Sequence, residues 1–163
     1  MSSIAPLSPV ARFLVIVGAT AGGAGLSPVA PGTVGTVVGV AVFWLMAQLP
    51  LYAYVVVLLG LIALAVWLAG LAERVFPGPD NQHIVIDEVV GLLATTIAVP
   101  FTYKTAIAAF IVFRIFDIAK PWPIRWVDEH LHGGFGVVLD DVVAGVFGCV
   151  VLHLVLHFFG GYL

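Results

Sequence analysis

The stretch LYAYVVVLLGLIALAVWLAGLA, residues 51–72, contains no charged side chain and decides the fold class of this chain. An α-helix rises about 1.5 Å per residue, so roughly 20 apolar residues cross the hydrocarbon core of a bilayer. We therefore expect residues 51–72 to span a membrane. We expect the whole chain to fold as an all-α integral membrane bundle.

The composition agrees with a membrane protein. The chain has 163 residues, of which 62% are hydrophobic and 9% are charged, whereas soluble domains contain about 25% charged residues. This length fits a single domain covering residues 1–163. The net charge is −3 and the six Lys and Arg residues are scattered, which argues against nucleic acid as a partner and leaves membrane lipids as the expected surroundings.

Further apolar segments predict about four to five hydrophobic helices. Residues 34–49 end at a proline and should pair with residues 51–72 as a hairpin. Residues 89–99 and 105–116 should form a second hairpin, and residues 142–159 a final helix. Each hairpin returns the chain to the face that it left, so the segments around residues 26–35, 73–88 and 117–141 should share one face.

The basic residues predict which face this is. Lys104 alone lies at the far turns, whereas the shared face carries Arg74, Arg114, Lys120 and Arg125. Lys and Arg are enriched on the cytoplasmic side of membrane proteins. The loops of the shared face, and any site that they form, should therefore face the cytoplasm.

The charged residues are concentrated in one part of the sequence. Twelve of the fifteen lie between Asp80 and Asp141, and ionisable groups at membrane depth are costly unless they are paired or bound to metal. Carboxylates without a Cys or His cluster favour Mg²⁺. The proposed metal ligands are Asp87, Glu88, Asp117, Asp140 and Asp141. The alternative is that the pairs 87–88 and 140–141 cap the starts of apolar helices, where a carboxylate gains about 0.3–1 kcal/mol.

A magnesium site suggests a phosphate ester as the substrate. Arg114, Asp117 and Lys120 recur every three residues, which keeps them on one helical face until Pro121 ends the helix. Arg114 and Lys120 could then bind phosphate oxygens while Asp117 faces the metal. An ordinary intrahelical ion pair is the alternative.

Two glycine-rich segments could complete the site. GAGLSPVAPGTVGT, residues 23–36, could offer backbone N–H groups and the hydroxyls of Thr33 and Thr36 to a bound anion. HGGFG, residues 132–136, is expected to be a flexible loop in which His132 could protonate a leaving alcohol. Both segments would also serve as plain turns.

The sequence lacks the motifs of a covalent phosphatase mechanism. Cys149 is followed by no Arg at the spacing of a cysteine-phosphatase loop, and neither DxDxT nor a nucleophile elbow is present. Attack by a metal-activated water is the simplest mechanism, with an Asp nucleophile as the alternative. We assign catalytic roles to Asp87, Asp141 and His132.

Four segments in order resemble the phosphatidylglycerophosphatase A family: residues 23–36, IVIDEVVG (84–91), FRIFDIAKPWPIRW (113–126) and HGGFGVVLDDVVAG (132–145). The resemblance implies an all-α, magnesium-dependent enzyme of the bacterial inner membrane. Such an enzyme hydrolyses phosphatidylglycerophosphate to phosphatidylglycerol and inorganic phosphate during glycerophospholipid biosynthesis. The polar positions that match the family's motifs are Asp87, Glu88, Arg114, Asp117, Lys120, His132, Asp140 and Asp141.

Two other classes of membrane protein remain as alternatives. A magnesium-dependent phosphotransferase would use similar ions, but its DGxxAR pattern is missing. A small transporter or channel would distribute its carboxylates along the membrane depth, whereas these carboxylates cluster near the ends of the predicted helices.

Overall fold

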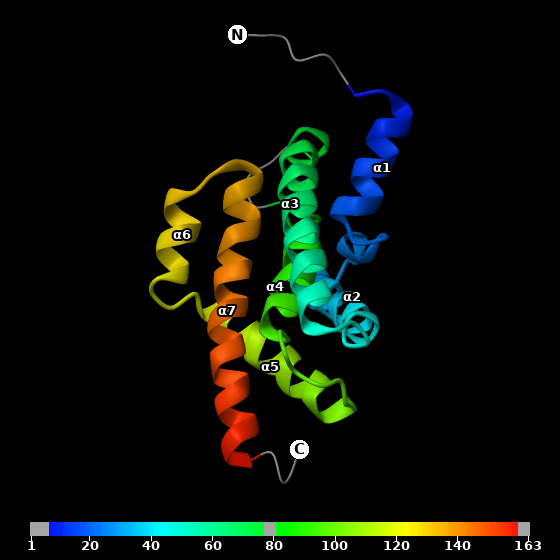
Figure 1. The fold of residues 1–163 in the computed structure, drawn as a ribbon. Helices are drawn as coiled ribbons and strands as arrows, with labels where there is room; N and C mark the ends of the chain where they lie inside the picture. Colours follow the sequence, from blue (N-terminus) through cyan, green and yellow to red (C-terminus); the bar gives the residue numbers. More distant parts are fainter. Residues whose placement is uncertain (1–6, 77–80, 160–163) are drawn as a thin grey trace.

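A computed structural model describes residues 7–76 and 81–159, and within them the chain is helical without a strand (Figure 1). This confirms the all-α class. Asp80, which was expected on the shared face, lies outside the described residues. The helices are α1 (Pro9–Ala19), the 3₁₀ helix η1 (Ala24–Leu26), α2 (Pro31–Met46), α3 (Leu51–Val75), α4 (Ile86–Thr95), α5 (Tyr103–Ala119), α6 (Ile124–His130) and α7 (Gly133–Phe159).

Helices α3 and α7 form the long axis of the molecule. They lie side by side and antiparallel, with α6 flanking α7 and α1 on the opposite side (Figure 1). Their lengths of 25 and 27 residues, with apolar sequences, make them the two helices of the described chain that could cross a membrane. The expected four to five hydrophobic helices are therefore not confirmed as membrane crossings.

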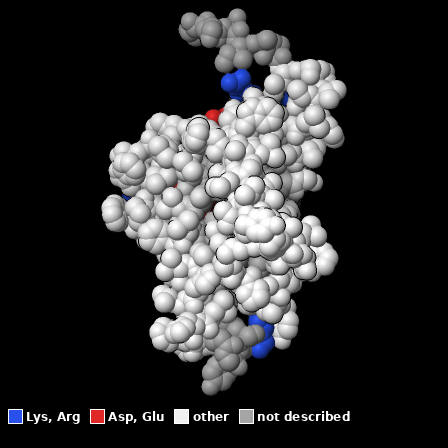
Figure 2. Space-filling model, in the orientation of Figure 1, with Lys and Arg blue, Asp and Glu red and all other residues white. Residues whose placement is uncertain are grey.

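The outer faces of these two helices carry apolar side chains. On α7, Val146, Val150, Leu154 and Phe158 recur every four residues and are all exposed. Tyr52, Val56, Leu59 and Trp67 are exposed in the same way on α3. The face drawn in Figure 2 is correspondingly white over most of its area. Such a surface is typical of contact with another apolar phase.

Helix α4 is a short helix inside the bundle. Residues 89–99 were expected to form a helix of a hairpin, but α4 covers Ile86–Thr95 and ends at Thr96. At about 1.5 Å per residue it is too short to cross a bilayer. All of its residues from Val89 to Thr95 are buried by the surrounding helices, and a helix buried on all sides is apolar all round.

Glycines bring α4 close to its neighbours. A Cβ atom at Gly145 of α7 would overlap the carbonyl oxygen of Gly91 in α4. On the other side of α4, a Cβ at Gly39 of α2 would lie 3.0 Å from a methyl group of Leu92. Helix α4 is thus held tightly between α2 and α7, and this fixes the position of its first turn.

Helix α7 begins nine residues before the expected start at residue 142. Gly133, with φ +68°, opens the helix, so most of the HGGFG segment is helical and the expected flexible loop is wrong. The close approach of Gly134 to Val66 and Gly70 of α3 gives the physical reason, because a Cβ at Gly134 would overlap their backbone. These glycines serve helix packing rather than flexibility.

The turns of both predicted hairpins meet at one end of the bundle. Leu49 and Leu51 from the α2–α3 turn, and Ala98 and Pro100 from the α4–α5 turn, line one cavity of about 250 Å³. The Tyr54 hydroxyl donates to the carbonyl oxygen of Leu93 at 2.8 Å. The remaining connections of the bundle come together elsewhere, around the charged residues.

Candidate active site

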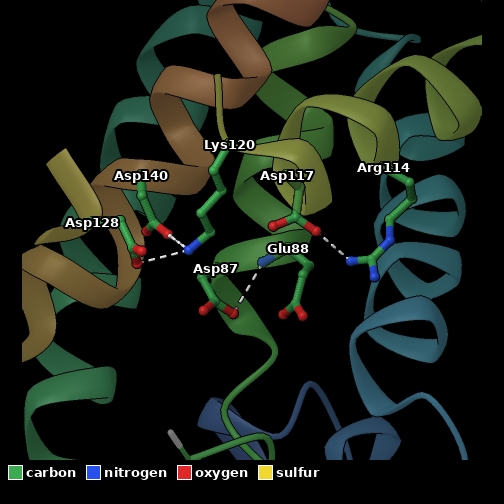
Figure 3. A network of polar contacts seen from close by, with 7 residues as sticks. All are labelled: Asp87, Glu88, Arg114, Asp117, Lys120, Asp128 and Asp140. Atoms are coloured by element: carbon green, nitrogen blue, oxygen red, sulfur yellow. Dashed lines mark hydrogen bonds and ion pairs between the residues drawn. The ribbon is translucent and has the colours of Figure 1, made fainter. Parts of the chain in front are cut away.

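The first turn of α4 supplies two adjacent carboxylates. Asp87 and Glu88 follow the N-cap residue Val85, whose N–H donates to the Ala19 carbonyl at 2.9 Å. The backbone N–H of Glu88 donates to Oδ1 of Asp87 at 3.0 Å (Figure 3). Carboxylates in a first turn are favoured by the helix dipole, so the capping interpretation accounts for part of this pair.

The second pair lies inside a helix rather than at its start. Asp140 and Asp141 are 5% and 4% exposed and lie about two turns after Gly133. The effect of the helix dipole falls off within the first turn. The capping interpretation therefore fails for Asp140 and Asp141, which are buried without that source of stabilisation.

Three carboxylates from the two helices converge. Single oxygen atoms of Asp87, Glu88 and Asp141 all lie within 4.8 Å of one another. Burial raises the pKa of Asp87 well above its usual range, and the neighbouring Glu88 charge raises it further. Burial also raises the pKa of Glu88. The charge of Arg114 lowers the pKa of Glu88 but does not outweigh burial, so three ionised carboxylates in this cluster call for further positive charge.

Two buried oxygen atoms in the same region lack a partner within the described protein. They are Oε2 of Glu88 and Oδ1 of Asp140. A buried acceptor without a partner costs about 1–3 kcal/mol. The donor set is made only of hard oxygen atoms, which is the set that Mg²⁺ takes in proteins. The residues present thus fit a magnesium ion.

The end of α5 brings two cations to opposite sides of this cluster. Arg114 Nη1 lies 2.5 Å from Oδ2 of Asp117, so the intrahelical ion pair that was the alternative interpretation is present for these two residues. Lys120 instead follows the last helical residue and has φ +41°. Pro121 cannot continue the helix, and the left-handed conformation of Lys120 turns its side chain away from the face that carries Arg114 and Asp117 (Figure 3).

Lys120 joins three segments through its ammonium group. Its Nζ atom lies 2.7 Å from Oδ1 of Asp128 and 2.7 Å from Oδ2 of Asp140. Burial alone would lower the pKa of Lys120, but the hydrogen bonds to Asp128 and Asp140 outweigh it and raise the pKa above its usual value. Lys120 is therefore a permanent positive charge beside the carboxylates.

A cavity of about 490 Å³ opens above these groups. It is lined by residues of α3, α4, α5, α6, α7 and the connections between them, among them Glu73, Gln82, Asp87, Glu88, Asp117, Lys120, Asp128, His132, Asp140 and Asp141. A second cavity of about 350 Å³ shares Gln82, Glu88 and Asp117 with the first and adds Thr33 and Arg114. The segments around residues 26–35, 73–88 and 117–141 therefore meet at this site.

Of the other proposed site residues, two line a cavity and one does not. His132 is exposed and lines the larger cavity, and Thr33 lines the smaller one. Thr36 is 0% exposed, and its hydroxyl donates to the carbonyl oxygen of Gly32 at 2.8 Å. The structure does not bring Thr36 to either cavity, because the regular helix of α2 turns this side chain into the bundle.

Asp128 is a residue of the site that was not among the predicted ligands. It follows the buried Ile124 of α6 by four residues and therefore lies on the same face of the helix. Glu129, on the neighbouring face, pairs with Arg125 in solvent at 2.8 Å. The position of Asp128 relative to the apolar Ile124 is the sequence signal that could have identified it.

Comparison with known proteins decides the class of this site. A family model described as "Phosphatidylglycerophosphatase A" matches residues 17–156. The chain belongs to the phosphatidylglycerophosphatase A family. It is therefore an enzyme, a phosphatase, as the resemblance of its motifs implied. The match covers all the carboxylates and cations of the two cavities.

Named relatives agree with this assignment. The chain is 41% identical over 137 residues to "Phosphatidylglycerophosphatase A" of Escherichia coli, covering 83% of this chain and 79% of the relative. It is 38% identical over 148 residues to a "Putative phosphatidylinositol-3-phosphatase" of Bacteroides thetaiotaomicron, covering 86% and 92%. It is also 42% identical over 79 residues to the Haemophilus influenzae phosphatidylglycerophosphatase A, covering 48% of each. No solved structure gave a significant match.

Proposed function

We propose that this enzyme hydrolyses phosphatidylglycerophosphate to phosphatidylglycerol and inorganic phosphate in glycerophospholipid biosynthesis, and that it depends on Mg²⁺. The observation that carries the proposal is the convergence of Asp87, Glu88 and Asp141 within 4.8 Å, beside a cavity that also holds a lysine. The E. coli relative, named for this activity, covers most of the chain.

The magnesium would be held by Asp87, Glu88 and Asp141, with Asp117 and Asp140 as further ligands at the edges of the cluster. When bound, the ion would offset the charge of the carboxylates and polarise the phosphate ester. Oε2 of Glu88 and Oδ1 of Asp140, buried without a protein partner, support this assignment of ligands.

The other side chains act directly on the phosphate monoester. Lys120 has three N–H donors, two of which are directed to Asp128 and Asp140. The third can donate to an oxygen of the terminal phosphate. His132 lines the same cavity, and its imidazolium can protonate the alcohol oxygen as the P–O bond breaks. Water supplies the new oxygen of the phosphate product.

The enzyme is proposed to be a multi-pass protein of the bacterial inner membrane whose site faces the cytoplasm. The exposed apolar faces of α3 and α7 support their insertion in lipid. Trp122 and Trp126 are 81% and 51% exposed next to the site, and tryptophan is enriched at the membrane–water interface. The site would then lie at headgroup depth, where a lipid phosphate is found.

The relative named as a phosphatidylinositol-3-phosphatase supports a second candidate substrate, a phosphatidylinositol phosphate. Its alignment covers 92% of that protein. Both headgroups join a phosphodiester to a phosphate monoester through a polyol. The two candidates therefore share their reaction and differ in the size of the polyol.

Phosphate release by the purified full chain in detergent micelles tests these proposals. We expect turnover of phosphatidylglycerophosphate with Mg²⁺, no turnover in excess chelator, and recovery when magnesium is restored. Full activity in chelator would refute the magnesium dependence. Faster release from a phosphatidylinositol phosphate than from phosphatidylglycerophosphate would favour the second candidate.

A further inference from the structure

The smaller cavity has no role in the proposed hydrolysis of the terminal phosphate. It lies between the start of α2 and the end of α5 and is lined by Thr33, Gln82, Arg114 and Ile118, with Glu88 and Asp117 as the wall shared with the larger cavity. Its volume is about 350 Å³. Each of the two adjoining cavities therefore contains one cation of α5 or its C-cap, and the carboxylates separate them.

The two cations are spaced along the chain. Arg114 lies within α5, whereas Lys120 is the C-cap residue that ends it in the left-handed conformation. Their side chains lie on opposite sides of Asp117 and Glu88 (Figure 3). Each cation has carboxylate partners of its own, Asp117 for Arg114 and both Asp128 and Asp140 for Lys120, so each can direct its remaining N–H donors to a separate anion. The site is thus suited to two anionic groups.

The proposed substrate has two such groups, and they differ in what they carry. The terminal phosphate is a monoester of glycerol, and the inner phosphate is a diester that also carries the diacylglycerol. We propose that the smaller cavity binds the phosphodiester of the lipid, with Arg114 as its cation, while the terminal phosphate occupies the larger cavity beside Lys120. This inference rests on the proposed function and divides its substrate between the two cavities.

The surroundings of Arg114 favour the diester in the smaller cavity and the terminal phosphate in the larger one, rather than the opposite arrangement. Ile111, Ile115 and Ile118 are 50%, 57% and 71% exposed and recur at helical spacing around Arg114 on α5. This apolar stripe leads from the smaller cavity toward the start of α5. The acyl chains attached to the diester can follow it, whereas Lys120 is enclosed by Asp128 and Asp140.

The start of α2 forms one wall of the smaller cavity. A Cβ atom at Gly32 would overlap the Glu88 carboxylate and lie 3.3 Å from Nη1 of Arg114. The start of α2 therefore lies directly against both side chains. The Thr33 side chain lines the cavity next to it, so its hydroxyl can donate to a diester oxygen.

Binding of two soluble anions to the purified full chain, each measured by calorimetry with Mg²⁺ present, tests the division. The probes are glycerophosphoglycerol, which has the diester alone, and inorganic phosphate. We expect Arg114→Gln to weaken glycerophosphoglycerol at least about tenfold, because a hydrogen bond to a charged group is lost, and to change phosphate affinity less than about twofold. Lys120→Gln should do the reverse. Thr33→Val should weaken glycerophosphoglycerol by a smaller factor.

Two control variants distinguish the loss of the Arg114 charge from a general disturbance of the structure. Arg114→Lys keeps the charge and should recover part of the affinity for glycerophosphoglycerol. Arg125→Gln removes an exposed arginine that lines neither cavity and should change neither affinity. Equal weakening of both anions by Arg114→Gln, or no binding of glycerophosphoglycerol to the unmodified chain, would overturn the inference.

The binding measurements do not require turnover, so they distinguish this inference from the proposed function. A chain that binds glycerophosphoglycerol through Arg114 but releases no phosphate from phosphatidylglycerophosphate refutes the proposed function. A chain that releases phosphate while Arg114→Gln leaves glycerophosphoglycerol binding unchanged refutes the division of the substrate and leaves the proposed function standing.

Discussion

The Nζ atom of Lys120 lies 2.7 Å from Oδ2 of Asp140, whose side chain is 7% exposed. This contact links the C-cap of α5 to the second turn of α7. The same ammonium group holds Asp128 of α6. Lys120 therefore ties together the elements that enclose the larger cavity, in addition to its proposed contact with phosphate.

Lys120→Gln should destabilise the protein as well as weaken phosphate binding. Removing one partner of a buried ion pair costs about 3–5 kcal/mol, and the partial exposure of Lys120 reduces our expectation to about 1–3 kcal/mol. Unfolding in detergent measures the loss. The double variant Lys120→Gln/Asp140→Asn should recover part of it, because the buried charge is removed as well. Purely additive losses would show that the pair is not coupled.

Asp87→Asn and Asp141→Asn should each lower turnover by about 10²–10³, which is the usual cost of losing an oriented charged group at a transition state. Both replacements keep the size of the side chain. Magnesium titration should show weaker activation in both variants. The control is Glu129→Gln, which changes an exposed residue and should stay within about ±0.5 kcal/mol in stability. Turnover of both Asn variants at the rate of the control would show that these carboxylates are not ligands.

His132→Gln should reduce kcat by about 10²–10⁴ if the imidazole protonates the leaving alcohol. His130→Gln is the matched control, because His130 stacks on Trp126 at 4.7 Å and lines no described cavity. A substrate with a more acidic leaving alcohol, such as an aryl phosphate, should lose less activity in the His132 variant. An equal loss with both leaving groups would assign His132 to binding instead.

Gly145→Ala should destabilise the protein by about 1–3 kcal/mol, since the added methyl group forces α7 away from the Gly91 carbonyl. The comparison is Gly60→Ala on α3, where an added Cβ has nothing within 4 Å. That replacement should be neutral or stabilising by up to about 1 kcal/mol, because alanine is the better helix former. Equal stabilities of the two variants in thermal unfolding would be inconsistent with the close packing of α4 and α7.

Cysteine labelling should place the start of α5 and the end of α6 on opposite membrane faces. Tyr103→Cys and Glu129→Cys, each in a Cys149→Ala background, replace exposed residues outside the two site cavities. A membrane-impermeant thiol reagent applied to intact spheroplasts should label Tyr103→Cys and leave Glu129→Cys unlabelled. Glu129→Cys should become labelled once the membrane is permeabilised. Labelling of both positions from one side would refute the proposed topology.

The sequence was sufficient to predict the long helices and the grouping of the charges. Residues 51–72 fall inside α3. A helix satisfies all the backbone hydrogen bonds of a long uncharged segment within the segment itself. The carboxylates of residues 87–88 and 140–141 could be assigned to one site, because a helical hairpin brings the chain back to the membrane face from which it started. All four line one cavity. Residues such as Gly145 were beyond prediction, because a small residue at a helix crossing looks the same in sequence as one at a turn.

Local apolarity alone does not identify a membrane span. Val89 to Thr95 is apolar because other helices surround α4, and a single sequence cannot distinguish protein from lipid as the surroundings. Likewise, the helical spacing of Arg114, Asp117 and Lys120 predicted one common face. Lys120 instead ends α5 in the left-handed conformation, with φ +41°, and the two cations line different cavities.

Helix α7 carries Asp140 and Asp141 near its beginning, and from Val142 to Phe159 it has no Asp, Glu, Lys or Arg. In the proposed membrane placement, the metal ligands and the lipid-embedded segment belong to the same rigid rod. Transmembrane helices adjust their tilt when bilayer thickness changes, and because α4 packs closely against α7, a tilt of α7 would carry the carboxylates of both helices with it and shift the site relative to the lipid headgroups. The enzyme would thus sense the thickness of the membrane whose lipids it makes, and its activity in vesicles of graded acyl length should pass through an optimum.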